Sequence, residues 1–191
     1  MPVPAIVLAA GSSRRLGRPK QLVEYRGESL LTRAARAATE SGASPLIVVL
    51  GAYAEEIRAS TRLKGATIVM NETWEQGIAN SIRAGLREVD ASASGVLILG
   101  CDQPRLTAAH LRSLLSAFEA RDAKSMVASV YAGIRGIPAV FPRGDFGCLK
   151  ELEGDKGART ILGDTGGDVV EVKFEGGEID IDWPKDLAQL D

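Results

Sequence analysis

Apolar positions fall into short uninterrupted runs along this chain, and stretches with helical spacing separate them. Such runs cover residues 5–10, 46–50 and 96–99, and a further short segment, 67–70, is apolar apart from Thr67. A run in which no position is polar is typical of a strand that is covered on both faces. We therefore predict four buried strands in the first hundred residues.

The segments between these runs have the spacing of amphipathic helices. Ser29 is a good N-cap residue, and apolar side chains repeat at helical spacing from there to about Glu40. The same pattern predicts a helix over 80–89 and another that begins at Thr107. Regular alternation of strands and helices predicts an α/β fold, with a mostly parallel sheet between two layers of helices.

The pattern after residue 120 is less regular. We expect strands over 126–131 and 138–141 around a loop at 133–138, then a helix over 158–162, a strand over 169–174 and a short helix near Pro184. Ligands of parallel α/β sheets bind beyond the carboxyl ends of the strands. We therefore expect the chemistry in the loops at Gly11, Asn71 and Cys101.

Length and composition are those of an ordinary globular domain. With 191 residues, of which 45% are hydrophobic, we expect residues 1–191 to form a single domain. The net charge of −2 argues against binding to nucleic acid, which usually requires a basic domain. Cys101 and Cys148 form no metal-binding pair, and the apolar segment 4–10 is too short to span a membrane. We expect a reduced, cytoplasmic protein without a nucleic-acid or membrane partner.

Four cations follow the first predicted strand in a loop that carries no acid. Arg14, Arg15, Arg18 and Lys20 come after Gly11 and two serines. The loop has neither the Walker A pattern nor the glycine pattern of dinucleotide-binding proteins. Backbone N–H groups in such a turn can hold phosphate oxygens, which arginine and lysine neutralise. The loop predicts a phosphate site, although an exposed basic loop has the same composition.

Carboxylates follow two other segments. Asp102 comes after the strand at 96–99 and before Pro104, where it could hold a hard cation or form a simple Asx turn. Asp180 and Asp182 precede the last predicted helix, where they could hold the same cation, although Asp182 could instead cap that helix. A cationic loop and these acids could meet around a metal and phosphates, but the residues alone leave both interpretations open.

Taken in order, these segments form a specific combination. The chain reads LAAGxSxRxGxPK at 8–20, CDQP at 101–104 and DIDxPxDL at 180–187. This combination resembles the small nucleotidyltransferases that mature the molybdenum cofactor, and within them most closely the molybdenum cofactor cytidylyltransferases. Further segments match as well, so that the resemblance covers nearly the whole chain: 71–77, 80–86, 136–138 and 154–159.

The resemblance implies a Rossmann-like three-layer sandwich of the nucleotide-diphospho-sugar transferase type, and a role for each matching residue. The nucleotide would be held by Leu8, Ala9, Ala10, Gly11, Arg15, Lys20, Asn71 and Ser81. Asp102 and Asp182 would bind Mg²⁺, with Asp180 as a secondary candidate, and Arg15, Lys20 and Asp102 would be catalytic. The acceptor would face Gln103, Gly136, Pro138 and Arg159.

The implied reaction is Mg²⁺-dependent transfer of CMP from CTP to the phosphate of molybdenum-bound molybdopterin, with release of pyrophosphate. A molybdoenzyme or its chaperone would be a further partner. The alternatives are a GTP-dependent guanylyltransferase, transfer to another phosphorylated metabolite, and a carrier or chaperone that binds nucleotide without transferring it. CTP is favoured because Ala10 stands where guanylyl-transferring relatives tend to have glycine, which leaves more room for a larger base.

The chain departs from the family pattern at two positions. Relatives often have glycine where this chain has Cys101, and histidine where it has Ile137, a position expected to face the acceptor. His110, the only histidine, falls in a helical pattern, and we expect it to have no catalytic role. A phosphate acceptor is already a nucleophile near neutral pH, so the reaction would need no general base.

Overall fold

A seven-stranded sheet forms the centre of the computed structural model, which describes residues 2–164 and 169–190. The strand order is β5-β4-β1-β6-β8-β7-β9. These strands are β1 (Ala5–Ala9), β4 (Leu46–Leu50), β5 (Ala66–Met70), β6 (Gly95–Gly100), β7 (Val127–Tyr131), β8 (Ile134–Pro142) and β9 (Val170–Lys173). A separate small ribbon pairs β2 (Glu24–Tyr25) with β3 (Glu28–Ser29).

The sheet is mostly parallel, as predicted. Only β8 runs against its two neighbours, β6 and β7, within the described residues. The loop expected at 133–138 is wrong, because β8 already begins at Ile134. Ala132 and Gly133 both have positive φ values and form a tight turn, so the chain reverses at once and pairs with β7.

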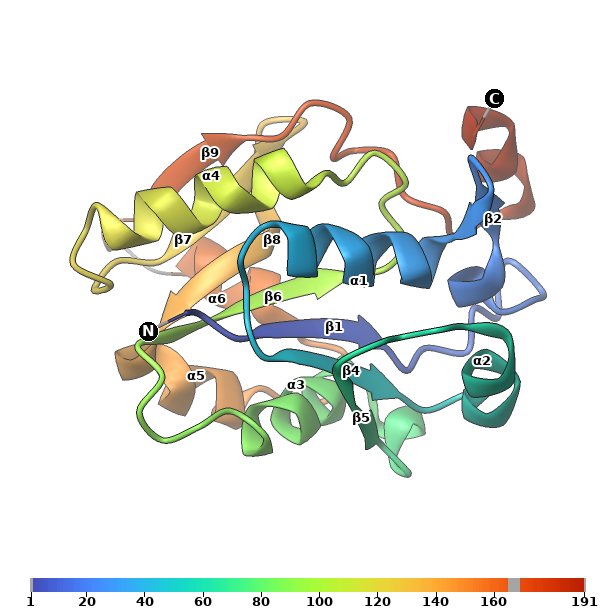
Figure 1. Cartoon of the computed structure of the whole chain (residues 1–191), viewed down its shortest axis with the longest axis horizontal. Helices are drawn as coiled ribbons and strands as arrows, with labels where there is room; N and C mark the ends of the chain where they lie inside the picture. The colour runs from blue at the N-terminus through green and yellow to red at the C-terminus, as the bar shows by residue number, and fades with distance from the viewer. Residues whose placement is uncertain (1, 165–168, 191) are drawn as a thin grey trace.

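Helices cover both faces of the sheet (Figure 1). One face packs against α1 (Leu30–Glu40), α2 (Ala54–Ser60) and α4 (Ala108–Glu119). The other packs against α3 (Ile78–Arg87), α5 (Phe146–Glu151) and α6 (Ala158–Asp164). Alternate side chains of each buried strand point to opposite faces, which is why β1, β4 and β6 contain no polar position.

The predicted starts of two helices, at Ser29 and Thr107, are confirmed by side-chain caps. The Ser29 hydroxyl accepts a hydrogen bond from the Thr32 N–H, and the Thr107 hydroxyl accepts one from the His110 N–H. The last predicted helix is a 3₁₀ helix, η4 (Pro184–Leu190). Three more 3₁₀ turns connect the main elements of the described chain: η1 (Lys20–Leu22), η2 (Trp74–Gln76) and η3 (Arg143–Asp145).

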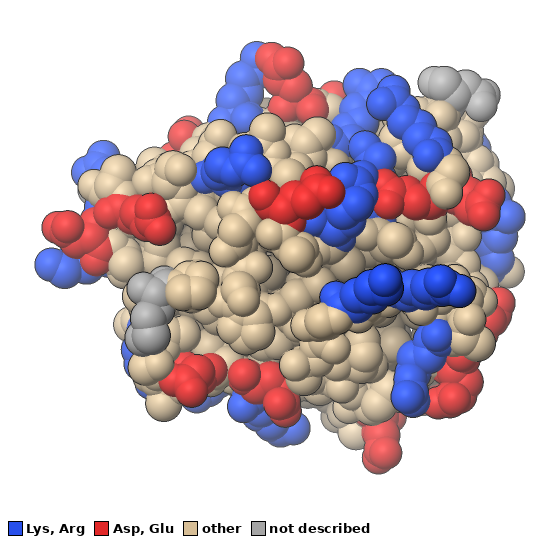
Figure 2. Space-filling model, in the orientation of Figure 1, with Lys and Arg blue, Asp and Glu red and all other residues tan. Residues whose placement is uncertain are grey.

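The carboxyl ends of β1, β4 and β6 lie at one edge of the sheet, toward the right of Figure 1. The C-terminal segment reaches this edge because Ile181 is fully buried against Leu16, Val23 and Leu30. No helix among the described residues is long and apolar enough to cross a membrane. Basic and acidic side chains are interspersed on the face shown in Figure 2.

Candidate functional site

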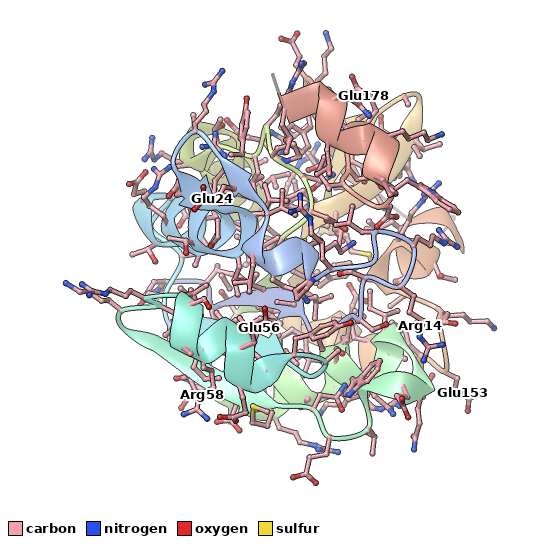
Figure 3. All side chains as sticks on the ribbon, turned by 90° about the vertical axis from the view of Figure 1, so that its right-hand side faces the viewer. Arg14, Glu24, Glu56, Arg58, Glu153 and Glu178 are labelled. Atoms are coloured by element: carbon pink, nitrogen blue, oxygen red, sulfur yellow. The ribbon has the colours of Figure 1, made fainter. Side chains whose placement is uncertain are left out.

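A cavity of about 390 Å³ opens at this edge of the sheet. Its walls come from the loop after β1, from η2 and the start of α3, and from the end of β6. Ile137 of β8 and Asp155 complete the lining. Figure 3 views the molecule from this side, with Arg14 of the first loop labelled. Loops that are distant in sequence therefore enclose one site, at the edge where the sequence predicts the chemistry.

Three predicted site residues converge on one point. The Lys20 ammonium donates hydrogen bonds to Asp102 Oδ2 at 2.7 Å and to Asp182 Oδ1 at 2.8 Å. All three side chains are partly shielded, with exposed fractions of 18%, 27% and 38% respectively. The cationic loop and the carboxylates from both later segments thus meet, as the charge pattern suggested.

Backbone contacts hold the two aspartates side by side. The Ile181 N–H donates to the Asp102 carbonyl at 3.0 Å, which ties the C-terminal segment to the loop after β6. The Asp182 carboxylate, for which a helix cap was the alternative role, bonds to Lys20, and the segment that precedes η4 is tied down by Asp186. Asp186 Oδ2 accepts hydrogen bonds from the Asp182 and Trp183 N–H groups, at 3.1 Å and 2.7 Å. The Asp182 carboxylate therefore faces Lys20.

The electrostatics of the cluster favour a cation. Burial lowers the pKa of Lys20, but the charge of Asp102 and the hydrogen bonds to Asp102 and Asp182 outweigh this and hold the pKa above its usual value. Burial and the neighbouring carboxylates raise the pKa of Asp180. Two carboxylate oxygens converge on a cation here, and such oxygens are the ligands that Mg²⁺ prefers. The donor set of Asp102 and Asp182 thus fits a hard divalent ion.

The end of β1 and the loop after it line the cavity through Leu8, Ala10 and Gly11, while Ala9 is buried. The Arg15 guanidinium stacks over the exposed Trp183 ring, 5.4 Å from its centroid. Of the two adjacent arginines, Arg14 is the one that lines the cavity among the described residues. The part of Arg15 in binding triphosphate stays a prediction.

Asn71 bonds to Ser81, which lies in the cavity wall. Asn71 Nδ2 donates to Ser81 Oγ at 3.0 Å, and both residues are buried. Ser81 lines the cavity, whereas Asn71 Oδ1 accepts from the Thr73 N–H and so shapes the turn that leads to η2. The structure brings both residues to the site, with Ser81 nearer to a ligand.

The residues expected to face the acceptor are anchored into the protein. Gln103 Nε2 donates to the Gly177 carbonyl at 2.8 Å. The Pro138 carbonyl accepts from Ser129 Oγ, and Gly136 makes room for the Tyr131 hydroxyl. Ile137, between these two residues, lines the cavity with its side chain. Of the two residues that depart from the family pattern, Ile137 is thus the one that lines the cavity.

The segment 154–159 reaches the cavity through a close backbone contact. The Ala79 N–H donates to the Gly154 carbonyl at 3.1 Å, and a Cβ at Gly77 would lie 2.2 Å from Gly154. Only glycine fits at Gly77, which also has a φ of +106°. Arg159, on α6, lies near Tyr131, and its charge partly offsets the rise that burial causes in the pKa of Tyr131.

Burial disfavours the charged forms of both His110 and the Cys101 thiol. Burial, together with the charge of Asp102, raises the pKa of Cys101 to about 12. His110 stacks on Phe174 and its Nε2 bonds to Ser129 Oγ at 2.8 Å. Because the Ser129 hydroxyl donates to the Pro138 carbonyl, His110 Nε2 carries a proton and donates to Ser129.

We expect His110 to make the fold sensitive to acid. Burial lowers the pKa of His110 from 6.5 to about 4, so the unfolded chain binds a proton at higher pH than the folded protein. The stabilisation is complete above pH 6.5 and is lost as the pH falls toward 4. Between about pH 7 and pH 5 the loss should reach about 2 kcal/mol. Urea unfolding of the wild type and of His110→Gln at both pH values measures this loss in the free energy of unfolding. An equal loss in both proteins would contradict the role of His110.

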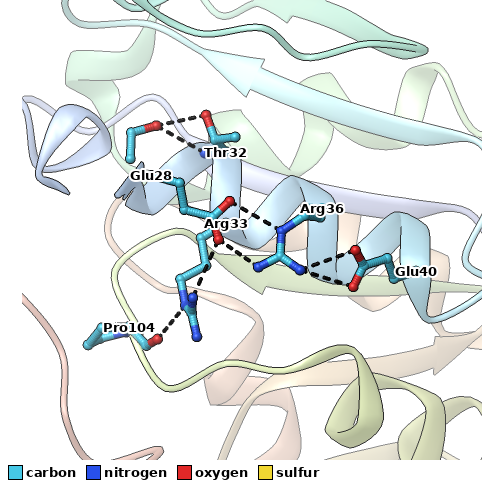
Figure 4. Close-up of polar contacts among 7 residues, drawn as sticks. Glu28, Thr32, Arg33, Arg36, Glu40 and Pro104 are labelled. Atoms are coloured by element: carbon cyan, nitrogen blue, oxygen red, sulfur yellow. Dashed lines mark hydrogen bonds and ion pairs between the residues drawn. The ribbon is translucent and has the colours of Figure 1, made fainter. Parts of the chain in front are cut away.

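An ion-pair network between β3 and α1 supports the loop that carries Asp102 (Figure 4). Arg33 Nε donates to the Pro104 carbonyl at 2.6 Å, and Arg33 also pairs with Glu28. Glu28 in turn pairs with Arg36, which pairs with Glu40. Sequence reasoning missed Arg33, because a basic residue on a helix is typical of a solvent-exposed position unless its tertiary neighbour is known.

Comparison with known proteins identifies the family. Residues 5–169 match the MobA-like NTP transferase domain. The chain belongs to this family. It is a nucleotidyltransferase, in agreement with the resemblance seen in its sequence.

Curated relatives are identical to the chain at about a third of the aligned positions. Nicotine blue oxidoreductase of Paenarthrobacter nicotinovorans is 34% identical over 84% of this chain and 81% of its own length. Purine catabolism protein PucB of Bacillus subtilis is 31% identical over 97% of this chain and 94% of its own. A probable molybdenum cofactor guanylyltransferase of Opitutus terrae is 34% identical over 71% of this chain and 64% of its own.

Solved structures confirm the predicted fold of the nucleotide-diphospho-sugar transferase type. Rv0371c from Mycobacterium tuberculosis H37Rv superposes with a TM-score of 0.86 at 33% identity, over 100% of this chain and 97% of that one. A complex of Rv0371c with manganese gives a TM-score of 0.80 at 29% identity, over the same shares of the two chains.

Proposed function

We propose that this nucleotidyltransferase transfers CMP from CTP to the phosphate of a molybdopterin-type acceptor and releases pyrophosphate. The observation that carries the proposal is the cluster of Lys20, Asp102 and Asp182 at a cavity rimmed by the loop after β1. A relative named as a molybdenum cofactor guanylyltransferase supports an acceptor of this class. The cytidylyltransferase pattern of 8–20 and Ala10 support CTP.

In the proposed reaction, an oxygen of the acceptor phosphate attacks the α-phosphorus. A bond forms between that oxygen and the phosphorus, and the bond to the β-phosphate oxygen breaks. Catalysis of such transfers depends on positioning and on neutralising charge. Lys20 would neutralise the leaving pyrophosphate, with Arg14 or Arg15 nearby, while the loop at 8–11 would hold the nucleoside. No residue has to remove a proton from the acceptor.

Asp102 and Asp182 would hold the metal ion that this chemistry requires. When bound, Mg²⁺ would neutralise the oxygens of the triphosphate. The manganese complex of the structural relative is in line with a divalent cation in this fold. The ammonium of Lys20 lies between the same two carboxylates, so the residues are already arranged around a positive charge.

The experiment that tests the proposal measures pyrophosphate release with Mg²⁺ and extracted molybdopterin, using CTP or GTP. We expect kcat/KM to be about tenfold or more higher with CTP, which corresponds to about 1.4 kcal/mol. Ala10→Gly should reduce the difference in kcat/KM between CTP and GTP, because Ala10 lines the cavity and glycine gives a larger base more room. A preference for GTP in the unmodified protein would contradict the choice of base.

Two controls separate the remaining alternatives. A dephosphorylated acceptor should not react, because the attacking group would be missing. Efficient transfer to a free hydroxyl would point to a different acceptor class. A carrier that only binds nucleotide would release no pyrophosphate with either nucleotide, even though binding could be detected.

A further inference from the structure

Gln21 is a polar residue in the centre of the protein, directly beneath the loop that lines the cavity. Its side chain is fully buried, although it follows Lys20 in a short 3₁₀ turn. Its Nε2 donates to the Ala9 carbonyl at 2.7 Å and to the Gly11 carbonyl at 2.9 Å. Gln21 Oε1 is buried and has no hydrogen-bond partner among the described residues. The amide is thus held by its two N–H groups alone.

The carbonyl of Ala10, between these two residues, is also hydrogen-bonded within the protein. Ala10 O accepts a hydrogen bond from the Ala52 N–H at 3.0 Å. All three carbonyls of residues 9–11 are therefore bonded to donors of the protein itself. A carbonyl oxygen turned into the cavity would repel the oxygens of a nucleotide, and these bonds prevent it. Gln21 supplies the donors for two of the three.

We propose that Gln21 is a positioning residue that fixes the conformation of the loop at 8–11 for nucleotide binding. This inference rests on the proposed function, since the loop is taken to hold the nucleoside. Gln21 does not touch the cavity itself; it acts through the backbone of Ala9 and Gly11. Because Gln21 follows Lys20 in the same 3₁₀ turn, this turn fixes the position of both the loop and the Lys20 ammonium.

The chemistry of the contact defines the substitutions that test it. Gln21→Glu keeps the size of the side chain but replaces the two donors by acceptors that face two carbonyls. Gln21→Met keeps the approximate volume and removes all polar atoms. Ser41→Ala is a matched control. Ser41 is also a buried polar residue whose hydroxyl donates to a backbone carbonyl, that of Ala38, but it lies at the end of α1.

Equilibrium binding of CTP, measured by calorimetry beside urea unfolding, gives the readout. We expect the Kd for CTP to rise about tenfold or more in both Gln21 variants, because two hydrogen bonds to the loop are lost. The KM for the acceptor should change little, so that only the affinity for the nucleotide is reduced. Ser41→Ala should lose stability without losing affinity for CTP.

The possible outcomes distinguish the two proposals. A wild type that binds no nucleoside triphosphate would overturn the proposed function. A wild type that binds CTP, with a Gln21 variant that folds and binds it equally well, would overturn the positioning role alone. An equal loss of affinity in Ser41→Ala would also overturn it, by showing that affinity follows stability. Unfolding of both Gln21 variants would overturn it too, by showing that the residue serves the fold as a whole.

Discussion

Replacing Asp102 by asparagine is expected to lower kcat/KM about 10²–10³-fold, equivalent to about 3–4 kcal/mol of transition-state stabilisation. The amide would keep the shape of the side chain but remove the charge that faces Lys20 at 2.7 Å. The Mg²⁺ concentration needed for half-maximal rate should rise as well, because a carboxylate binds a hard cation better than an amide does. The measurement is pyrophosphate release over a range of Mg²⁺ concentrations.

The fold should survive this substitution, since Asp102 is partly exposed and its main-chain carbonyl still binds the Ile181 N–H. Thermal unfolding recorded beside the activity separates loss of chemistry from loss of structure. Asp122→Asn, at an exposed turn after α4, is a suitable control and should be fully active. Turnover near that of the wild type in a folded Asp102→Asn protein would rule out Asp102 as a metal ligand.

The buried strands and the capped helices could be predicted because their signals are local. A run such as 46–50 has no polar position, and Ser29 and Thr107 bond within their own helices. The helices α2 and α5 were missed, because each is short and buries only two of its side chains. Their apolar periodicity is too brief to stand out.

The candidate site also has a part that the sequence predicts and a part that depends on the fold. The charges of Lys20, Asp102 and Asp182 mark them in the sequence, but their pairing spans 82 and 162 residues and depends on the packing of Ile181. Gln21 gave no signal at all. A glutamine beside a lysine is typical of a surface, and only the sheet above it makes its amide a buried donor.

Replacing Lys20 by methionine should also lower kcat/KM by about two orders of magnitude, because the charge that would neutralise the leaving pyrophosphate is lost. The same substitution should have the opposite effect on metal binding. In the wild type the ammonium lies within 2.8 Å of an oxygen of each carboxylate that would bind the metal, and so competes with it. Without nucleotide, Lys20→Met should therefore bind Mn²⁺ more tightly than the wild type does.

Mn²⁺ binding followed by electron paramagnetic resonance measures this difference directly. A general defect in folding would weaken metal binding and activity together, whereas loss of the ammonium should strengthen the first and weaken the second. The double variant Lys20→Met/Asp102→Asn should not show the tighter Mn²⁺ binding of Lys20→Met, because one of the two carboxylates is then missing. If Lys20→Met bound Mn²⁺ no better than the wild type, the ammonium and the metal would not share a site, and Asp102 and Asp182 would serve only to orient Lys20.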